Sequence, residues 1–348
     1  MSGPGNPLEK THASSLPTIS KTVYPIAGIL TTVYGLSELP QNISELSCLW
    51  LLHPRLQTQA SMAPLAAQSI HNWNSRRGNS GKGLIAISFD QRNHGSRLVD
   101  KMANESWRQG NERHAQDMFS CYQGTSQDCS LLLTHLSSYL PQSLPPLKEH
   151  LVLGISLGGH AAWHCLLSDP RITAGVVIIG CPDYQRLMLQ RAEKSRRKTF
   201  GPDFLGSTDF PNALVAAVDA FDPAGLFLPR ELKGPNVVPA GIASVVPNPS
   251  IQASTATLLT SKLQNKKILL QSGGADKLVP HTCGETFLRF LKTAAGSWWK
   301  NNGLVLDDRV YEGVGHETTP QMATEAVEWI GDILAGDIRV GGVKESRI

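Results

Sequence analysis

A serine in a turn of small residues is the first feature of this 348-residue sequence that could do covalent chemistry. Ser156 is the central residue of GISLG (residues 154–158), which follows the apolar run HLVL and precedes the small residues GHAAW. The G-x-S-x-G pattern lets a chain turn sharply from a strand into a helix, and it exposes the serine hydroxyl above the helix N-terminus. Ser156 is therefore a candidate nucleophile. The other interpretation is a glycine-rich strand–helix turn with no chemistry.

The sequence also supplies an acid and a base in the required order. A serine hydroxyl needs a base to take its proton, and that base needs an acid to orient it. After a G-x-S-x-G turn, the acid comes next in the chain and the histidine last. Asp276 ends KKILLQSGGAD and His316 lies in RVYEGVGHE, both in glycine-containing turns after apolar runs. Alternatives stay open: Asp276 could cap a helix, Asp183 in GCPD is a rival acid, and His316 could be a surface histidine.

An oxyanion hole would need two backbone amides. One is expected from Leu157 and the other from the loop after the first interior parallel strand, residues 52–56. Pro54 has no N–H, so the second donor must be Arg55 or Leu56, and we expect Arg55. The side chain of His53 either braces this loop by hydrogen bonds or is simply a buried, satisfied histidine.

These residues require a parallel sheet to bring them together. Residues 22–38 are broken at Gly28 and predict a hairpin of two strands. Six further runs, the last one weaker, are apolar on both faces, as interior parallel strands are: residues 47–53, 83–90, 150–156, 174–181, 266–273 and 308–315. Helical patterns lie between them, at residues 61–73, 130–140, 159–167 and 324–334. The alternation predicts an α/β, doubly wound, mostly parallel sheet of about eight strands.

The interval between the sixth and seventh strands is too long for an ordinary crossover, so we expect a helical cap inserted there. The expected organisation is a flexible leader (1–20), a core (21–182 and 263–336), a cap or lid (183–262) and a C-terminal tail (337–348). The apolar cap residues either line an acyl tunnel or form the cap's own core; they include Met188, Phe200, Phe204, Phe210, Leu214, Val215, Phe221, Leu226 and Phe227. The basic run 191–198 is either a solvated helix face or a dock for an acidic acyl carrier protein.

Composition excludes several classes of partner. A net charge of +3, with 18% charged residues, gives no reason to expect nucleic acid or an anionic membrane surface. The apolar stretches are too short to span a membrane. The chain has no metal-ligand spacing and no phosphate- or dinucleotide-binding loop, so neither a metal nor a cofactor is expected.

The six cysteines are scattered without paired spacing, and the N-terminus has no secretory-signal pattern. Both features favour a reducing compartment, and we expect the cytoplasm. The ending Ser346-Arg347-Ile348 loosely resembles a peroxisomal S-K-L signal and keeps that location as an alternative.

Over about residues 22–336 the chain resembles the α/β-hydrolase superfamily, with GISLGGH as the nucleophile turn and GGAD and GVGH as the acid and base turns. FDQRNHGSR (89–97) is similar to the family's D-x-R-G-H-G-x-S loop, which implies that Asp90, Arg92 and His94 support the loop. Pro54 and Asn93 stand where the family has glycine. The segments HPRLQT and FDQRNHGSRLVD are similar in sequence to segments of fungal hydrolases of this superfamily. Some relatives of this kind are stand-alone thioesterases that act beside polyketide synthases.

The expected function is a serine hydrolase that forms a covalent acyl-enzyme from a carboxylic ester or thioester with a medium apolar acyl chain. One alternative is transfer of the acyl group to the substrate's own hydroxyl, which gives a lactone. Another is a hydrolase-fold binding module or receptor with little turnover, which the irregular loop at Pro54 favours.

Overall fold

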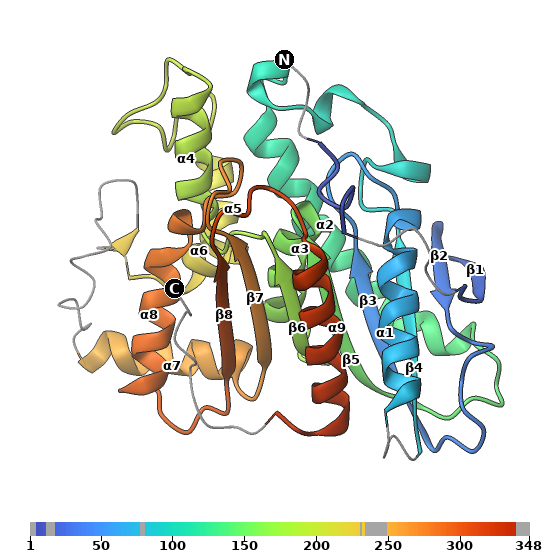
Figure 1. The fold of residues 1–348 in the computed structure, drawn as a ribbon. Coiled ribbons are helices and arrows are strands. Elements are labelled where there is room, and N and C mark those ends of the chain that lie inside the picture. The colour runs from blue at the N-terminus through green and yellow to red at the C-terminus, as the bar shows by residue number, and fades with distance from the viewer. Residues whose placement is uncertain (1–4, 12–17, 77–80, 230–231, 234–248, 339–348) are drawn as a thin grey trace.

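The computed structural model describes residues 5–11, 18–76, 81–229, 232–233 and 249–338. In this part of the chain eight strands form one sheet in the order β1-β2-β4-β3-β5-β6-β7-β8 (Figure 1). They are β1 (Lys21–Ile26), β2 (Ile29–Tyr34), β3 (Glu45–Leu52), β4 (Lys82–Phe89), β5 (Leu147–Ile155), β6 (Ile172–Ile178), β7 (Lys267–Gly273) and β8 (Val305–Tyr311). β2 pairs antiparallel with β1 and β4, and all other neighbours are parallel. The predicted doubly wound, mostly parallel sheet is confirmed.

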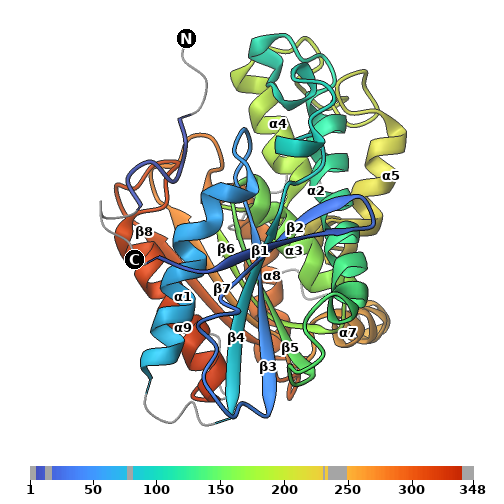
Figure 2. The same cartoon turned by 90° about the vertical axis from the view of Figure 1, so that its right-hand side faces the viewer.

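Helices cover both faces of the sheet. α1 (Ala63–Ser75) and α9 (Pro320–Ala335) lie on one side, and α2 (His114–His135), α3 (Leu157–Ser168) and α8 (Glu285–Gly296) on the other (Figure 2). Within β3, Trp50 packs in the core under α2 and α3, while its neighbours Leu49 and Leu51 pack under α1 and α9. Because alternate side chains of an interior strand enter two cores, the whole strand must be apolar.

The predicted helix at residues 130–140 is wrong in extent. α2 begins at His114, and its last regular turn ends at His135. The part of the helix before residue 130 buries polar side chains, including Thr125 and Asp128, among apolar ones such as Phe119, so its apolar stripe is interrupted. Asp128 pairs with Arg92 and Arg97, so the buried carboxylate holds the 90–97 loop against the helix.

The segment between β6 and β7 contains α4 (Tyr184–Lys194), α5 (Asn212–Phe221), α6 (Pro223–Phe227) and α7 (Pro249–Leu263). α4 and α5 stand beyond the carboxyl edge of the parallel strands, whereas α7 packs against α3 (Figures 1 and 2). Five of the apolar cap residues belong to the same buried core as α2 and α3: Met188, Phe204, Phe210, Leu214 and Phe227. They do not line an open tunnel. Phe200 and Phe221 are exposed.

The predicted leader, cap and C-terminal tail are described only in part. Residues 5–11, within the predicted leader, are packed: Thr318 N–H donates to Pro7 O (2.8 Å), and Thr11 Oγ1 donates to Thr318 O (2.7 Å). Residues 234–248 of the predicted cap and the ending 346–348 lie outside the described residues. The division into core and cap stays a prediction.

Candidate active site

The three residues predicted as a triad meet at the carboxyl edge of the sheet. Ser156 follows β5, Asp276 follows β7 and His316 follows β8, so parallel neighbours bring the three turns to one edge. Ser156 Oγ lies 2.9 Å from His316 Nε2, and His316 Nδ1 lies 2.8 Å from Asp276 Oδ2. This is the hydrogen-bond order in which a histidine can take the serine proton.

Asp276 is built to stay ionised. Its side chain is fully buried, and burial alone would raise its pKa. Hydrogen bonds from His316 and from the backbone amides of Leu278 (2.8 Å) and Val279 (2.9 Å) outweigh burial and hold the pKa of Asp276 below its usual range. The carboxylate therefore accepts from His316 Nδ1–H, which leaves the Nε2 lone pair facing Ser156.

The rival acid is occupied elsewhere. Asp183 caps α4 by accepting a hydrogen bond from the backbone amide of Arg186 (3.0 Å), and it pairs with the Arg186 guanidinium (3.0 Å). Burial raises the pKa of Asp183 to about 6. The structure thus joins His316 to Asp276 and gives Asp183 the role of a helix cap.

Close backbone packing forces Ser156 into a rare conformation, with φ 55° and ψ −112°. A Cβ on Gly154 would lie 1.9 Å from the carbonyl oxygen of Gly158, and one on Gly158 would lie 2.0 Å from that of Leu52. Ser156 N–H donates to Ile178 O (2.9 Å), which ties the turn to β6. Gly158 is therefore required by contact with the end of β3, and Gly154 by contact with the first turn of α3.

We expect Gly158→Ala to abolish labelling of Ser156 by a fluorophosphonate, because the added methyl clashes with the Leu52 carbonyl and must displace the turn. We also expect its Tm to fall by several degrees, since an overpacked site costs about 1–3 kcal/mol. Gly296→Ala is the matched control, since nothing lies within 4 Å of the added atom. Wild-type labelling in Gly158→Ala would contradict this account of the turn.

His160 is a positioning residue that the sequence analysis missed. Its Nδ1–H donates to Ser156 O (2.7 Å), and its Nε2 accepts from Cys181 N–H (3.4 Å), an assignment that follows from the partners. Burial lowers the pKa of His160 to about 3, so the ring stays neutral and can both donate and accept. The signal was its place directly after GISLGG, on the first turn of α3.

Buried neutral histidines make stability depend on pH. Burial lowers the pKa of His53 to about 4 and the pKa values of His160 and His164 to about 3. Between these values and pH 6.5 the unfolded chain binds protons that the folded chain does not, so stability falls as the pH drops. Each group contributes about 1.4 kcal/mol per pH unit within that window.

We therefore expect Tm to fall steeply from pH 6.5 to pH 5, and less steeply in His164→Leu. His164 Nε2 is buried with no hydrogen-bond partner among the described residues, so Leu removes a titrating group without breaking a bond there. His135→Asn, at an exposed position, is the control and should keep the wild-type slope. Equal slopes for wild type and His164→Leu in thermal denaturation would contradict the assignment.

The side chain of His53 braces the loop after β3 by hydrogen bonds, which was one of its two interpretations from the sequence. His53 Nδ1–H donates to Pro54 O (2.8 Å), and Nε2 accepts from Gln91 N–H (3.0 Å). Gln57 N–H donates to Pro54 O (3.2 Å), which closes a turn with Leu56 at φ 64°.

Both predicted oxyanion donors border one small cavity of about 10 Å³, since Arg55 and Leu157 line it together. The N–H of Leu157 is the first of α3 and has no acceptor within the helix. The two amides stay the predicted oxyanion donors.

Asp90 supports the neighbouring loop. Its Oδ1 accepts from Gln59 N–H (2.8 Å), and its Oδ2 accepts from the backbone N–H and the hydroxyl of Ser96 (2.8 Å each). Burial would raise the pKa of Asp90, but these bonds hold it below its usual range. The loop that carries Arg92 and His94 is thereby tied to the start of α1.

A cleft of about 910 Å³ opens onto His316 of the triad. It is lined by His316 and Glu317, Arg55, and residues from the segments 5–10, 106–109 and 275–278. The expected apolar cap residues are not among its lining. Most of the residues that line it have charged or amide side chains.

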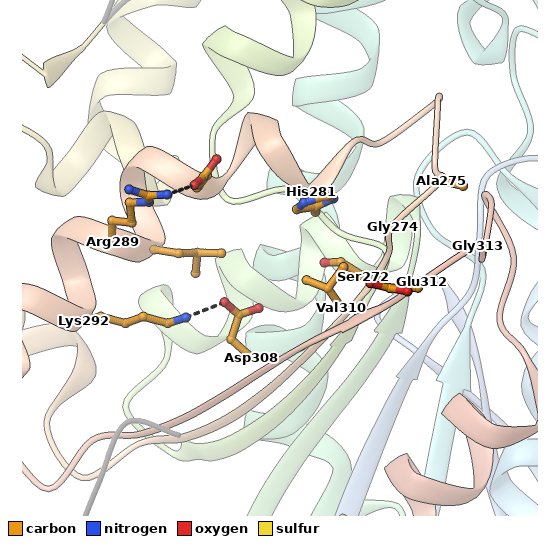
Figure 3. Close-up of a pocket in the computed structure, with 12 residues that line it drawn as sticks. Ser272, Gly274, Ala275, His281, Arg289, Lys292, Asp308, Val310, Glu312 and Gly313 are labelled. Atoms are coloured by element: carbon orange, nitrogen blue, oxygen red, sulfur yellow. Dashed lines mark hydrogen bonds and ion pairs between the residues drawn. The ribbon is translucent and has the colours of Figure 1, made fainter. Parts of the chain in front are cut away.

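A second cavity, of about 660 Å³, lies behind the acid turn, between α8 and the ends of β7 and β8 (Figure 3). Its wall contains two ion pairs, Lys292–Asp308 (2.7 Å) and Arg289–Glu285. Ala275 borders both cavities, but Ser156 and His316 do not line this one. The cleft at His316 is therefore the candidate substrate site.

The basic run 191–198 is not a free solvated face. Lys194 Nζ donates to Lys277 O (2.7 Å), and Arg197 pairs with the buried carboxylate of Asp209 (2.7 Å). Arg191 Nη2 donates to Leu278 O (3.2 Å), next to the triad aspartate. The interpretation of this run as a simple solvated helix face is wrong for Arg191 and Arg197.

No protein-family model matches the sequence, and no curated protein matches it. Among solved structures, TT1662 from Thermus thermophilus has a TM-score of 0.52 at 17% identity, over 91% of this chain and 99% of that one. A protein of unknown function from Agrobacterium tumefaciens, described as a candidate α/β hydrolase, has a TM-score of 0.46 at 15% identity, over 91% and 98%. The acylaminoacyl peptidase of Pyrococcus horikoshii has a TM-score of 0.49 at 11% identity, over 95% of this chain and 43% of that one.

These likenesses concern the fold, because the identities are low. The sheet order, the strand–helix turn at Ser156 and the likeness to TT1662 agree with the predicted α/β-hydrolase fold. Within the described residues no helix is long and apolar enough to cross a membrane. Nor do His, Cys, Asp and Glu side chains gather there in threes that could hold a metal ion. All six cysteines are buried and unpaired.

Proposed function

We propose that this protein is a serine hydrolase that cleaves a carboxylic ester or thioester through a covalent acyl-enzyme. The observation that carries the proposal is the hydrogen-bonded chain from Ser156 through His316 to the buried carboxylate of Asp276, at a strained turn above a helix N-terminus. A serine without such a chain is a weak nucleophile.

The reaction follows from the positions of these groups. His316 Nε2 takes the Ser156 proton as Oγ bonds to the substrate carbonyl carbon, and Asp276 stabilises the resulting imidazolium. The amides of Leu157 and Arg55 stabilise the negative oxygen of the tetrahedral intermediate. His316 then gives its proton to the leaving alcohol or thiol. Water then attacks the acyl ester of Ser156 as His316 takes its proton, and His316 returns that proton to Ser156 Oγ when the acid leaves.

The medium apolar acyl chain has less support than the chemistry, because five of the expected tunnel residues pack into the core and none of the expected tunnel residues lines the cleft. A thioesterase role with an acyl carrier protein stays a proposal, and it needs a docking surface other than Arg191 and Arg197, which are engaged within the fold. Lactone formation would use the same acyl-enzyme with an internal hydroxyl in place of water. A binding role without turnover stays the other alternative, although the turn after Pro54 is closed by a hydrogen bond and braced by His53.

The proposal is tested by fluorophosphonate labelling of the wild type and of Ser156→Ala. We expect rapid labelling of the wild type and none of the variant, because only Ser156 is deprotonated by a paired histidine. Ser168→Ala, at the exposed C-terminal end of α3, is the matched control and should label as the wild type does. An unlabelled wild type, or equal labelling of Ser156→Ala, would overturn the hydrolase proposal. A chain-length series of 4-nitrophenyl esters and acyl thioesters then compares the acyl groups.

A further inference from the structure

Two guanidinium groups near Ser156 and His316 have no carboxylate partner among the described residues. Arg55 Nη1 donates to the backbone oxygen of Asn104 (2.8 Å), a neutral acceptor. Arg191, on α4, donates to His114 Nε2 (3.2 Å), Met118 Sδ (2.9 Å) and Leu278 O (3.2 Å), which are also neutral. Arg191 Nε is buried and has no hydrogen-bond partner in the described chain.

His114 cannot neutralise these charges. Its Nδ1–H donates to Glu105 O (2.9 Å), so its Nε2 accepts from Arg191 and the ring carries no charge. Burial and the nearby charges of Arg191 and Arg55 hold the pKa of His114 well below its usual range. Both cations therefore act on a neutral ring, and the pKa of Arg55 falls to about 10 through burial and the charge of Arg191.

The carboxylates around Arg55 leave its charge unpaired. Glu105 acts on it electrostatically, without an ion pair within 4.0 Å in the described chain. Asp117 borders the small cavity beside Arg55, but burial raises its pKa and it accepts a hydrogen bond from Asn111. Confined cations without a counter-ion cost free energy unless a ligand supplies the negative charge.

Arg55 is also placed to meet the substrate. It lines the cleft together with His316, and it lines the small cavity together with Leu157. Three further cations border the cleft (Lys10, Arg108 and Lys277), against two carboxylates (Glu9 and Glu317). The cleft at His316 is therefore net positive, and one of its cations, Arg55, also borders the predicted oxyanion site.

We propose that the acyl part of the substrate carries a carboxylate, which the Arg55 guanidinium binds beside the scissile carbonyl while Arg191 adds positive potential from behind. The inference rests on the proposed hydrolase function and names its substrate class: hemiesters or hemithioesters of short dicarboxylic acids. A planar guanidinium pairs with a carboxylate through two parallel hydrogen bonds, which suits a compact polar cleft.

Two fluorophosphonates test this without requiring turnover. Both carry the same four-carbon alkyl chain on phosphorus; one ends in a carboxylate and the other in its methyl ester. We expect the wild type to react at least tenfold faster with the carboxylate probe, the scale of a charge-assisted hydrogen bond in a partly buried site. In Arg55→Met the ratio of the two rates should fall to near one, and Arg55→Lys should restore part of it.

A change at the oxyanion site would slow both probes alike, whereas loss of charge recognition would slow only the carboxylate probe. The ratio of the two rates within one variant therefore reports charge recognition alone. Lys198→Met, at an exposed position just after α4, is the matched control and should keep the wild-type ratio. Equal rates in the wild type would overturn this proposal and leave the hydrolase in place. An unchanged preference in Arg55→Met would overturn the assignment to Arg55. If neither probe labels the wild type, the proposed function falls.

Discussion

The approach of Gly158 to the carbonyl of Leu52 is the contact on which the site depends. It brings the N-terminus of α3 against the end of β3, so that the nucleophile turn and the turn containing Arg55 share one small cavity. Any side chain at position 158 would separate them. The strained backbone of Ser156 persists because hydrogen bonds to β6 and the packing against β3 fix both sides of the turn.

Buried neutral histidines stabilise this arrangement, and their surroundings differ from those of His316, the predicted general base. His53 and His160 are buried, and each uses one ring nitrogen as donor and the other as acceptor to join two turns. His316 instead borders the open cleft and contacts an ionised carboxylate. The same side-chain chemistry therefore serves positioning where the ring is desolvated and proton transfer where a carboxylate can stabilise the imidazolium.

The sheet and the three triad positions could be predicted because both depend on short-range patterns. Interior strands such as β3 must be apolar on both faces, and the carboxyl ends of parallel neighbours converge whatever the connecting segments are. The part of α2 before residue 130 was missed because its buried face mixes apolar side chains with polar ones, among them Asp128, which pairs with arginines of a distant loop.

The roles of the other residues depend on contacts with segments distant in the sequence, and no local sequence pattern encodes such contacts. From the sequence, Arg191 belongs to a basic run that could be a solvated helix face. In the fold its guanidinium donates to His114 and to the backbone of the acid turn. Met188 and Phe210 were equally compatible with a tunnel and with a core, and only the packing of α4 and α5 distinguishes the two. Residues 5–11 looked like a loose leader, but they pack beside the turn of His316 and form part of the cleft wall.

The central claim is that Ser156 carries the acyl group during turnover. The most direct measurement is acid quenching of the reaction with a 4-nitrophenyl ester at early times, followed by mass spectrometry of the intact chain and of its peptides. The account predicts one acyl group per chain, on the peptide that contains Ser156. An acyl group on another residue would contradict the account. So would a pre-steady-state burst of 4-nitrophenol during which no acylated chain is detected.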